Sequence, residues 1–125
     1  MGKLIYGDLS FILNGIFFDV HNQLGFGHRE KAYCQAIIQS LKRNKINFIY
    51  QFKIPLFFNN GQIGKRYMDF LVGNKVVVEV KSKKRVLNRD FKQLYEYLKF
   101  SEYKLGLLVI FKEEEVKIYR ILNIY

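Results

Sequence analysis

Apolar residues recur every three or four positions near the start of the chain. Between residues 9 and 24 they are Leu9, Ile12, Leu13, Ile16, Phe17, Val20 and Leu24. This spacing predicts an amphipathic helix with Asp8 as its N-cap. Gly25 and Gly27 then break the pattern and allow positive φ between two helices. A second helix is expected from Arg29 to Asn44.

From residue 46 onward the pattern changes to alternation, which is typical of a strand with one buried face. The alternating apolar positions are Ile46, Phe48, Tyr50, Phe52, Ile54 and Leu56. Asn60-Gly61 predicts a hairpin turn. Two further strands are expected from Ile63 to Val72 and from Val76 to Lys81, with a turn at Gly73-Asn74 between them.

The last third of the chain begins with a basic connection that runs from Lys81 to Arg89. A helix is expected from Asn88 to Phe100. Leu105 to Phe111 is apolar without alternation, which predicts a fully buried strand, and Val116 to Leu122 predicts a final strand. We therefore expect a single domain over residues 1–125, of the α/β (α+β) class, with a mixed central sheet flanked by helices.

The charge balance favours a polyanionic partner. The chain has 21 Lys and Arg against 11 Asp and Glu, a formal net charge of +10. Such an excess attracts nucleic acid or an anionic membrane surface, although a biased amino-acid composition would also produce it. Nucleic acid is the partner that we expect.

The single cysteine and the absence of targeting patterns indicate the compartment. Cys34 has no second cysteine to pair with, which suits a reducing environment, and its apolar neighbours predict a core position. We find neither a segment apolar enough to span a bilayer nor a signal-peptide pattern at the N-terminus. We expect a cytoplasmic protein that does not insert into a membrane.

The candidate chemistry lies on two adjacent predicted strands. Glu79 and Lys81 are two positions apart on one strand and therefore share a face. Asp69 is flanked by apolar residues in the preceding strand, where a buried carboxylate needs a cation. Two carboxylates form a hard oxygen site suited to Mg²⁺ or Mn²⁺. An adjacent lysine can orient or help deprotonate a water, or stabilise charge on a phosphate.

The loop between these strands tests the hypothesis. A two-residue turn would place Asp69 opposite Val78 and turn Glu79 to the other face of the sheet. A three-residue loop over positions 73–75, or a bulge, would make Asp69 and Glu79 direct cross-strand partners. The alternative is that Glu79 and Lys81 form an exposed ion pair and that Asp69 bonds to backbone.

A family resemblance is carried by the segment from His21 to Tyr33. It closely resembles the signature of the GxxExxY family, whose naming residues match Gly27, Glu30 and Tyr33. The likeness continues in family order to about residue 111. The further matching segments are Asp69 with Val72, Glu79-Val80-Lys81, Gln93 to Leu98, and Leu105 to Leu108. Ile110 departs from the pattern, because the family commonly has Asn there.

That family is placed in the PD-(D/E)XK nuclease superfamily, whose restriction-endonuclease-like core is a helix, a three-stranded meander, a helix and a further strand. The resemblance implies that Glu30, Asp69 and Glu79 surround a metal ion and that Lys81 assists the attacking water. It also implies that Gln93 lies at the rim of the site. Tyr97 would lie one helical turn away on the same face.

We therefore expect a nuclease that uses Mg²⁺ or Mn²⁺ and acts on DNA, or less favourably on RNA. The candidate substrate-binding residues are His21, Tyr33, Lys83, Lys84, Arg85 and Tyr97. His21 could instead bond to backbone at a helix end, and Tyr33 could orient Glu30. Symmetric cutting of a duplex would need a homodimer. The alternatives are a catalytically silent nucleic-acid-binding module and an interaction component of a repair or defence assembly.

Overall fold

The computed structural model describes residues 5–124. Two helices come first, then a three-stranded meander, a third helix and two final strands, which is the predicted order. The elements are α1 (Gly7–Leu24), α2 (Glu30–Arg43), β1 (Phe48–Phe58), β2 (Gly61–Val72), β3 (Val76–Ser82), α3 (Asn88–Lys99), β4 (Leu105–Phe111) and β5 (Val116–Leu122).

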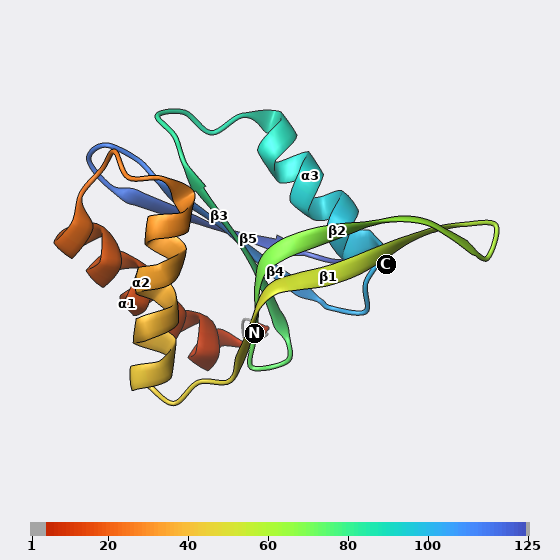
Figure 1. The fold of residues 1–125 in the computed structure, drawn as a ribbon, viewed down its shortest axis with the longest axis horizontal. Coiled ribbons are helices and arrows are strands. Elements are labelled where there is room, and N and C mark those ends of the chain that lie inside the picture. The colour runs from red at the N-terminus through yellow and green to blue at the C-terminus, as the bar shows by residue number, and fades with distance from the viewer. Residues whose placement is uncertain (1–4, 125) are drawn as a thin grey trace, which may run out of the picture.

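The strands form one mixed sheet in the order β1-β2-β3-β4-β5. β3 and β4 run parallel, whereas the other neighbouring pairs are antiparallel. The parallel pair is joined through α3, since parallel neighbours need a long crossover. α1 and α2 lie on one side of the sheet and α3 lies on the other (Figure 1). The predicted fold class is confirmed.

The apolar run in β3 follows from this layering. Val76 and Val78 pack in the core under α1 and α2, and Val77 packs in the core under α3. β4 is buried along its whole length, as its unbroken apolar sequence predicts. A strand covered by helices on both faces has no solvent-facing positions, and it therefore shows no alternation.

Two local predictions need correction. α1 begins after Tyr6 rather than at Asp8, so Asp8 lies in the first turn and is not the N-cap. The β1–β2 turn is one residue earlier than expected. Asn59 and Asn60 both have positive φ, and Phe58 pairs with Gly61. Asn tolerates this conformation well enough to occupy both central positions of a two-residue hairpin.

The register between β2 and β3 agrees with the three-residue loop. Val72 pairs with Val76 and Phe70 with Val78, which leaves positions 73–75 in the loop. The next residues along the two strands are Asp69 and Glu79. The condition set by the sequence, that these two carboxylates face each other, is therefore met.

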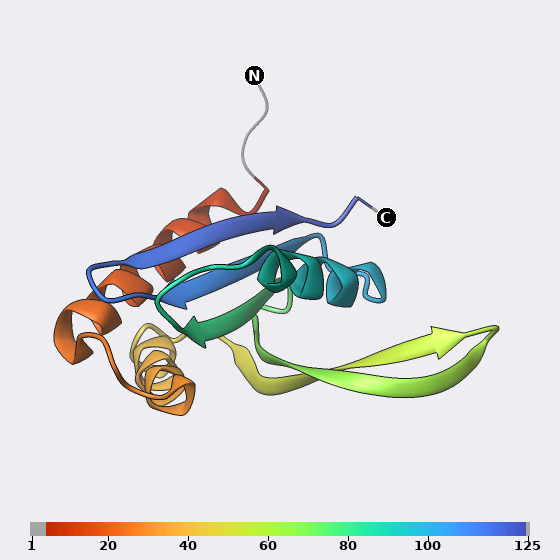
Figure 2. The ribbon, with the colours of Figure 1, turned by 90° about the horizontal axis from the view of Figure 1, so that it is seen from above.

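The β1–β2 hairpin changes face part of the way along, so the prediction that β1 has one buried face is wrong. Tyr50 packs in the α1/α2 core, but Phe52, two residues later, packs in the α3 core. Gln51 lies between them with φ of 56° and sits opposite Asp69 in the register. A left-handed residue rotates the strand, and beyond it the hairpin projects away from the rest of the fold (Figures 1 and 2).

A stability prediction follows from the contact between α3 and β4. A Cβ added to Gly106 would lie 2.9 Å from Leu98 Cδ1 and 3.3 Å from Leu94 Cδ2, and both leucines are buried. Gly106→Ala is therefore expected to lower the free energy of unfolding by about 1–3 kcal/mol through overpacking. Urea denaturation measures this change.

The matched control is Gly15→Ala in α1. No atom lies within 4 Å of the added Cβ. Alanine should therefore raise the free energy of unfolding by about 0.5–1 kcal/mol, because it is the better helix former. Equal effects at the two positions would contradict the packing explanation.

Within residues 5–124, none of the three helices combines the length and the apolar character that a membrane crossing requires.

Candidate active site

The site is built around two carboxylates at the point where β2 leaves β3. The backbone ladder between these strands ends at Phe70 and Val78. Beyond it, the Val80 N–H donates to Asp69 Oδ2 at 2.7 Å, and the Asp69 N–H donates to Glu79 Oε1 at 3.2 Å. Each carboxylate thus accepts a backbone N–H of the opposite strand, and the two side chains are held together.

This arrangement disfavours a second negative charge. Burial raises the pKa of Glu79 to about 9, with further contributions from its hydrogen bond to Asp69 and from the charge on Asp69. Lys81 acts in the opposite direction and favours the ionised form. In the metal-free protein these effects therefore favour the protonated form of Glu79, and a bound cation would favour release of the proton.

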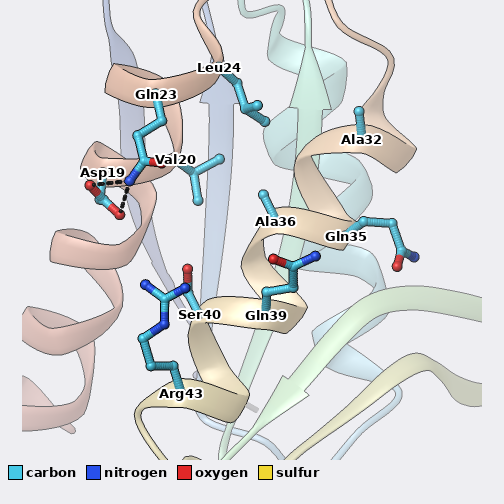
Figure 3. Close-up of a pocket in the computed structure, with 10 residues that line it drawn as sticks. All are labelled: Asp19, Val20, Gln23, Leu24, Ala32, Gln35, Ala36, Gln39, Ser40 and Arg43. Atoms are coloured by element: carbon cyan, nitrogen blue, oxygen red, sulfur yellow. Dashed lines mark hydrogen bonds between the residues drawn. The ribbon is translucent and has the colours of Figure 1, made fainter.

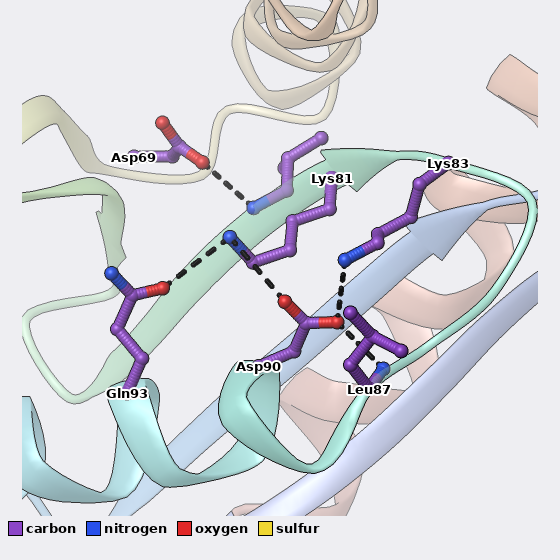
Figure 4. A network of polar contacts seen from close by, with 7 residues as sticks. Asp69, Lys81, Lys83, Leu87, Asp90 and Gln93 are labelled. Carbon is purple, nitrogen blue, oxygen red and sulfur yellow. Dashed lines mark hydrogen bonds and ion pairs between the residues drawn. The ribbon is translucent and has the colours of Figure 1, made fainter.

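Lys81 links the carboxylate pair to α3. Its Nζ lies 3.5 Å from Gln93 Oε1 and 4.0 Å from Asp90 Oδ1. Figure 4 shows that Asp69 on β2, Lys81 on β3 and Gln93 on α3 lie near one another. The crossover from β3 to α3 brings Lys81 and Gln93 together, as the resemblance implies, although they are 12 positions apart.

Asp90 is the buried centre of a second network (Figure 4). Its Oδ2 accepts from Lys83 Nζ at 2.8 Å and from the Leu87 N–H at 2.8 Å. Burial opposes the charged form, but the hydrogen bonds to Lys83 and Leu87 and the lysine charges outweigh it and lower the pKa of Asp90. The side chain thereby holds the β3–α3 loop and the start of α3.

Asp90→Ala is expected to lower the free energy of unfolding by about 3–5 kcal/mol, because it leaves the Lys83 charge and the Leu87 N–H unpaired. Thermal denaturation at neutral pH measures this change. The matched control is Glu115→Ala, which breaks the exposed Lys117–Glu115 pair (3.1 Å) and should leave the melting temperature unchanged. Equal shifts would contradict the structural role of Asp90.

A cleft of about 540 Å³ lies beside Lys81, between the outer face of α3 and the hairpin. It is mostly basic. The lining residues are Arg66, Lys81, Lys83, Arg89, Asp90, Lys92, Gln93, Glu96 and Tyr97. Gln93 and Tyr97 share this face, as the resemblance implies. The arrangement suits an extended anionic substrate whose backbone reaches Lys81.

Several residues that line the cleft were not predicted from the sequence. Arg89, Lys92 and Glu96 share one helix face with the predicted Gln93, at the three- and four-residue spacing of a helix, so that signal was present in the sequence. Arg66 carried no such signal. It lies in the cleft only because the hairpin rotates at Gln51 and turns that side of β2 toward α3.

Glu30 is the first residue of α2. Burial raises its pKa, Lys81 opposes that effect, and the nearby Asp69 carboxylate adds to it. Glu30 therefore lies within electrostatic range of the pair. However, over residues 5–124 no three His, Cys, Asp or Glu side chains are grouped closely enough to form a complete metal site. The role of Glu30 as a metal ligand remains a prediction.

Two predicted substrate contacts are engaged elsewhere. The Tyr33 side chain is fully buried, stacks on Phe111 at 4.1 Å between ring centroids, and donates to the Gly25 carbonyl. The Tyr33 side chain is therefore packed in the core, which disagrees with the prediction that it contacts the substrate. His21 Nε2 donates to the Lys112 carbonyl at 2.7 Å, which agrees with the alternative of a helix-terminal histidine bonded to backbone.

The basic loop after β3 is divided between two places. Lys83 lines the cleft and pairs with Asp90. Lys84 lines a separate hollow with the acidic turn Glu113 to Glu115, and Arg85 is exposed but does not line the cleft. Of the three predicted substrate-binding residues Lys83, Lys84 and Arg85, the structure therefore brings only Lys83 to the candidate site.

A second hollow, of about 430 Å³, lies between α1 and α2 on the side of the sheet away from α3. Its polar lining includes Gln35, Gln39 and Arg43 (Figure 3). Asp19 and Gln23 bond to each other there, with both contacts at 3.0 Å. It has no paired carboxylates with a neighbouring lysine, so the basic cleft is the better candidate.

A family model described as the PD-(D/E)XK nuclease superfamily matches residues 7–121. No curated protein matches the chain. Among solved structures, the crystal structure of SSO0001 superimposes with a TM-score of 0.61 at 19% sequence identity. The match covers 74% of this chain and 50% of SSO0001, so the chain spans about half the length of that protein. At this identity the likeness concerns the fold alone.

Proposed function

Since the chain belongs to the PD-(D/E)XK nuclease superfamily, we propose that it hydrolyses phosphodiester bonds of DNA with a divalent metal ion, Mg²⁺ or Mn²⁺. The observation that carries the proposal is the pairing of Asp69 with Glu79 beside Lys81, and Lys81 lines a basic cleft. Two carboxylates, a lysine and a cationic surface are the groups that metal-assisted phosphodiester hydrolysis uses.

The donor set fits such an ion. Mg²⁺ is commonly held by one or two carboxylates, with waters and substrate phosphates completing its coordination, so a three-carboxylate cage is not required. Asp69 and Glu79 would hold it, with Glu30 as a third candidate on α2. The raised pKa of Glu79 supports this assignment, because a cation beside the pair would offset the repulsion between its charges. When bound, the ion would polarise the phosphate and acidify a water.

Lys81 would stabilise negative charge that develops on the phosphate. Its ammonium group shares the face of β3 that carries Glu79, and Gln93 Oε1 accepts from it at the rim of the cleft. Gln93 thereby limits the positions of the Lys81 head group. A preorganised cation costs no reorganisation at the moment of reaction, and such groups contribute strongly to the rate.

Finer assignments belong to the same proposal. Gly27 precedes α2, and Glu30 and Tyr33 lie in its first turn; because these residues match the signature of the GxxExxY family, we propose membership of that family. Action as a homodimer on duplex DNA, and an intracellular location, are proposed on the grounds given by the sequence. Lys83 and Tyr97 are the proposed substrate-binding residues that line the cleft.

The test is a cleavage assay on labelled duplex DNA, single-stranded DNA and RNA, with Mg²⁺, with Mn²⁺ and with EDTA. Metal-dependent cleavage of DNA that EDTA abolishes is the expected result. Salt-sensitive binding without cleavage under any of these conditions would overturn the enzymatic proposal in favour of a silent nucleic-acid-binding module. Neither binding nor cleavage would favour an interaction protein.

A further inference from the structure

The part of the β1–β2 hairpin beyond Gln51 has, apart from Arg66, no role in the site described above. We call residues 52–68 the arm. Figures 1 and 2 show it projecting from the sheet, away from α1 and α2. At its base Phe52 packs against Tyr103, with 5.5 Å between ring centroids. Its strands extend about 20 Å further to the Asn59-Asn60 turn, at the usual rise per residue.

The arm carries positive charge without any acidic residue. Positions 52–68 contain Lys53, Lys65 and Arg66 and no Asp or Glu. All three cations are exposed, and none of them forms an ion pair with any residue of the described range 5–124. Unpaired cations on a projecting ribbon favour a polyanionic partner.

The end of the arm is apolar and exposed. Phe58 is 66% exposed and Ile63 is 68% exposed, and the neighbouring Phe57 is 50% exposed. A register shift between Leu56 and Phe57 displaces the strands here. Large apolar side chains on a projecting tip are costly to leave in water, which indicates a surface that becomes covered on binding.

The arm is also continuous with the candidate active site. Arg66 belongs to the arm and lines the basic cleft, and Asp69 follows the arm directly in β2. A partner held along the arm would therefore extend into the cleft and reach Lys81, which shares a face of β3 with Glu79. This continuity favours the substrate as the occupant of the arm, over a second protein.

We propose that the arm binds along the major groove of duplex DNA, with Lys53 and Lys65 on the phosphates and the apolar tip on base edges. This inference rests on the proposed function and names the form of its substrate. The major groove of B-DNA, about 12 Å wide, admits a two-stranded ribbon, and thymine methyl groups there accept apolar contacts. The major groove of an RNA duplex is too narrow for side chains to read, which favours DNA.

The two parts of the arm make different contributions to binding, and a salt series separates them. Lys53→Ala with Lys65→Ala should reduce the slope of log affinity against log salt by about 1.8, because two phosphate contacts are lost. Phe57→Ala with Phe58→Ala should weaken binding roughly tenfold or more and leave that slope unchanged, since no counterions are involved. Circular dichroism verifies that each variant folds.

Binding is measured by fluorescence anisotropy with a short labelled DNA duplex in EDTA, so that no cleavage occurs. Lys42→Ala with Arg43→Ala, at the end of α2, is the charge-matched control, and Phe11→Ala on α1 is the control for an exposed aromatic. Both controls should bind as the wild type does. A duplex of RNA should bind more weakly and show no loss with the tip variant.

Three results would overturn the inference. Arm variants that bind duplex DNA as tightly as the wild type would show that the arm does not contact it. A wild type that binds no duplex DNA would do the same. Tip variants that change only the sedimentation behaviour would assign the arm to a second copy of the chain. Failure of catalysis alone is distinct, because it leaves arm-dependent binding intact and abolishes only cleavage with Mg²⁺.

Discussion

Asp69→Asn is expected to reduce Mg²⁺-dependent cleavage by roughly a thousandfold or more, and Lys81→Ala by roughly a hundred- to a thousandfold. The amide that replaces the Asp69 carboxylate can still accept from the Val80 N–H, so the fold at the end of the β2–β3 ladder is kept while the charge that holds the cation is lost. Lys81→Ala removes the positive charge beside the phosphate. Initial rates on the preferred substrate measure both effects.

The controls separate chemistry from folding and from binding. Asp19→Asn on α1 and Lys84→Ala outside the cleft make the same chemical changes away from the site, and they should cleave at the wild-type rate. Binding of DNA without metal should be retained in Asp69→Asn. Cleavage by Asp69→Asn at an undiminished rate would show that the carboxylate pair is not the active site.

The metal-free protein is expected to lose stability as the pH rises, and Glu79 is the cause. Its pKa is 4.5 in the unfolded chain and about 9 in the fold, so between these values the folded state holds a proton that the unfolded state has released. The free energy of unfolding should therefore decrease with rising pH, by up to about 1.4 kcal/mol per pH unit. The contribution of Glu79 is full below the lower pKa and is lost as the pH rises through the higher one.

Urea denaturation in EDTA over a series of pH values measures this effect. Glu79→Gln should flatten the dependence, because glutamine is neutral throughout and can still accept from the Asp69 N–H. Glu115→Gln is the control, since that carboxylate is exposed and pairs with the exposed Lys117. Mn²⁺ should stabilise the wild type more at alkaline than at acidic pH. An unchanged slope in Glu79→Gln would mean that Glu79 is not the titrating group.

Whether Asp69 and Glu79 face each other was predictable up to one unknown, the length of the β2–β3 loop, because register depends on local features. Side chains alternate along a strand, so the parity of the loop alone decides whether Asp69 and Glu79 face each other. The sequence named the odd loop as the condition for a paired site, and Val72 pairs with Val76 as that condition requires. The helices were predictable for the same reason, since their apolar spacing is read within one segment.

The rotation of the hairpin was not predictable in this way. The alternation through Phe52 and Ile54 continues without a break in the sequence, but Gln51 adopts a positive φ and the strand changes face there. The residue types around Gln51 do not indicate a positive φ there, because glutamine rarely adopts one. The position of Arg66 in the cleft beside α3 could therefore not be predicted from the sequence either.

Periodicity along the chain was enough to predict the order of the elements and the packing of helices on an apolar sheet, and it set the condition under which two carboxylates pair beside a lysine. These follow from periodicity and from the short separation of β2 and β3 along the chain. Packing between distant segments decided which side chains remain free to contact a substrate. It buried Tyr33 against Phe111, engaged His21 with a backbone carbonyl, and placed Asp90 between lysines. The physical reason is that burial and long-range contacts depend on the packing of distant segments, which no local pattern records.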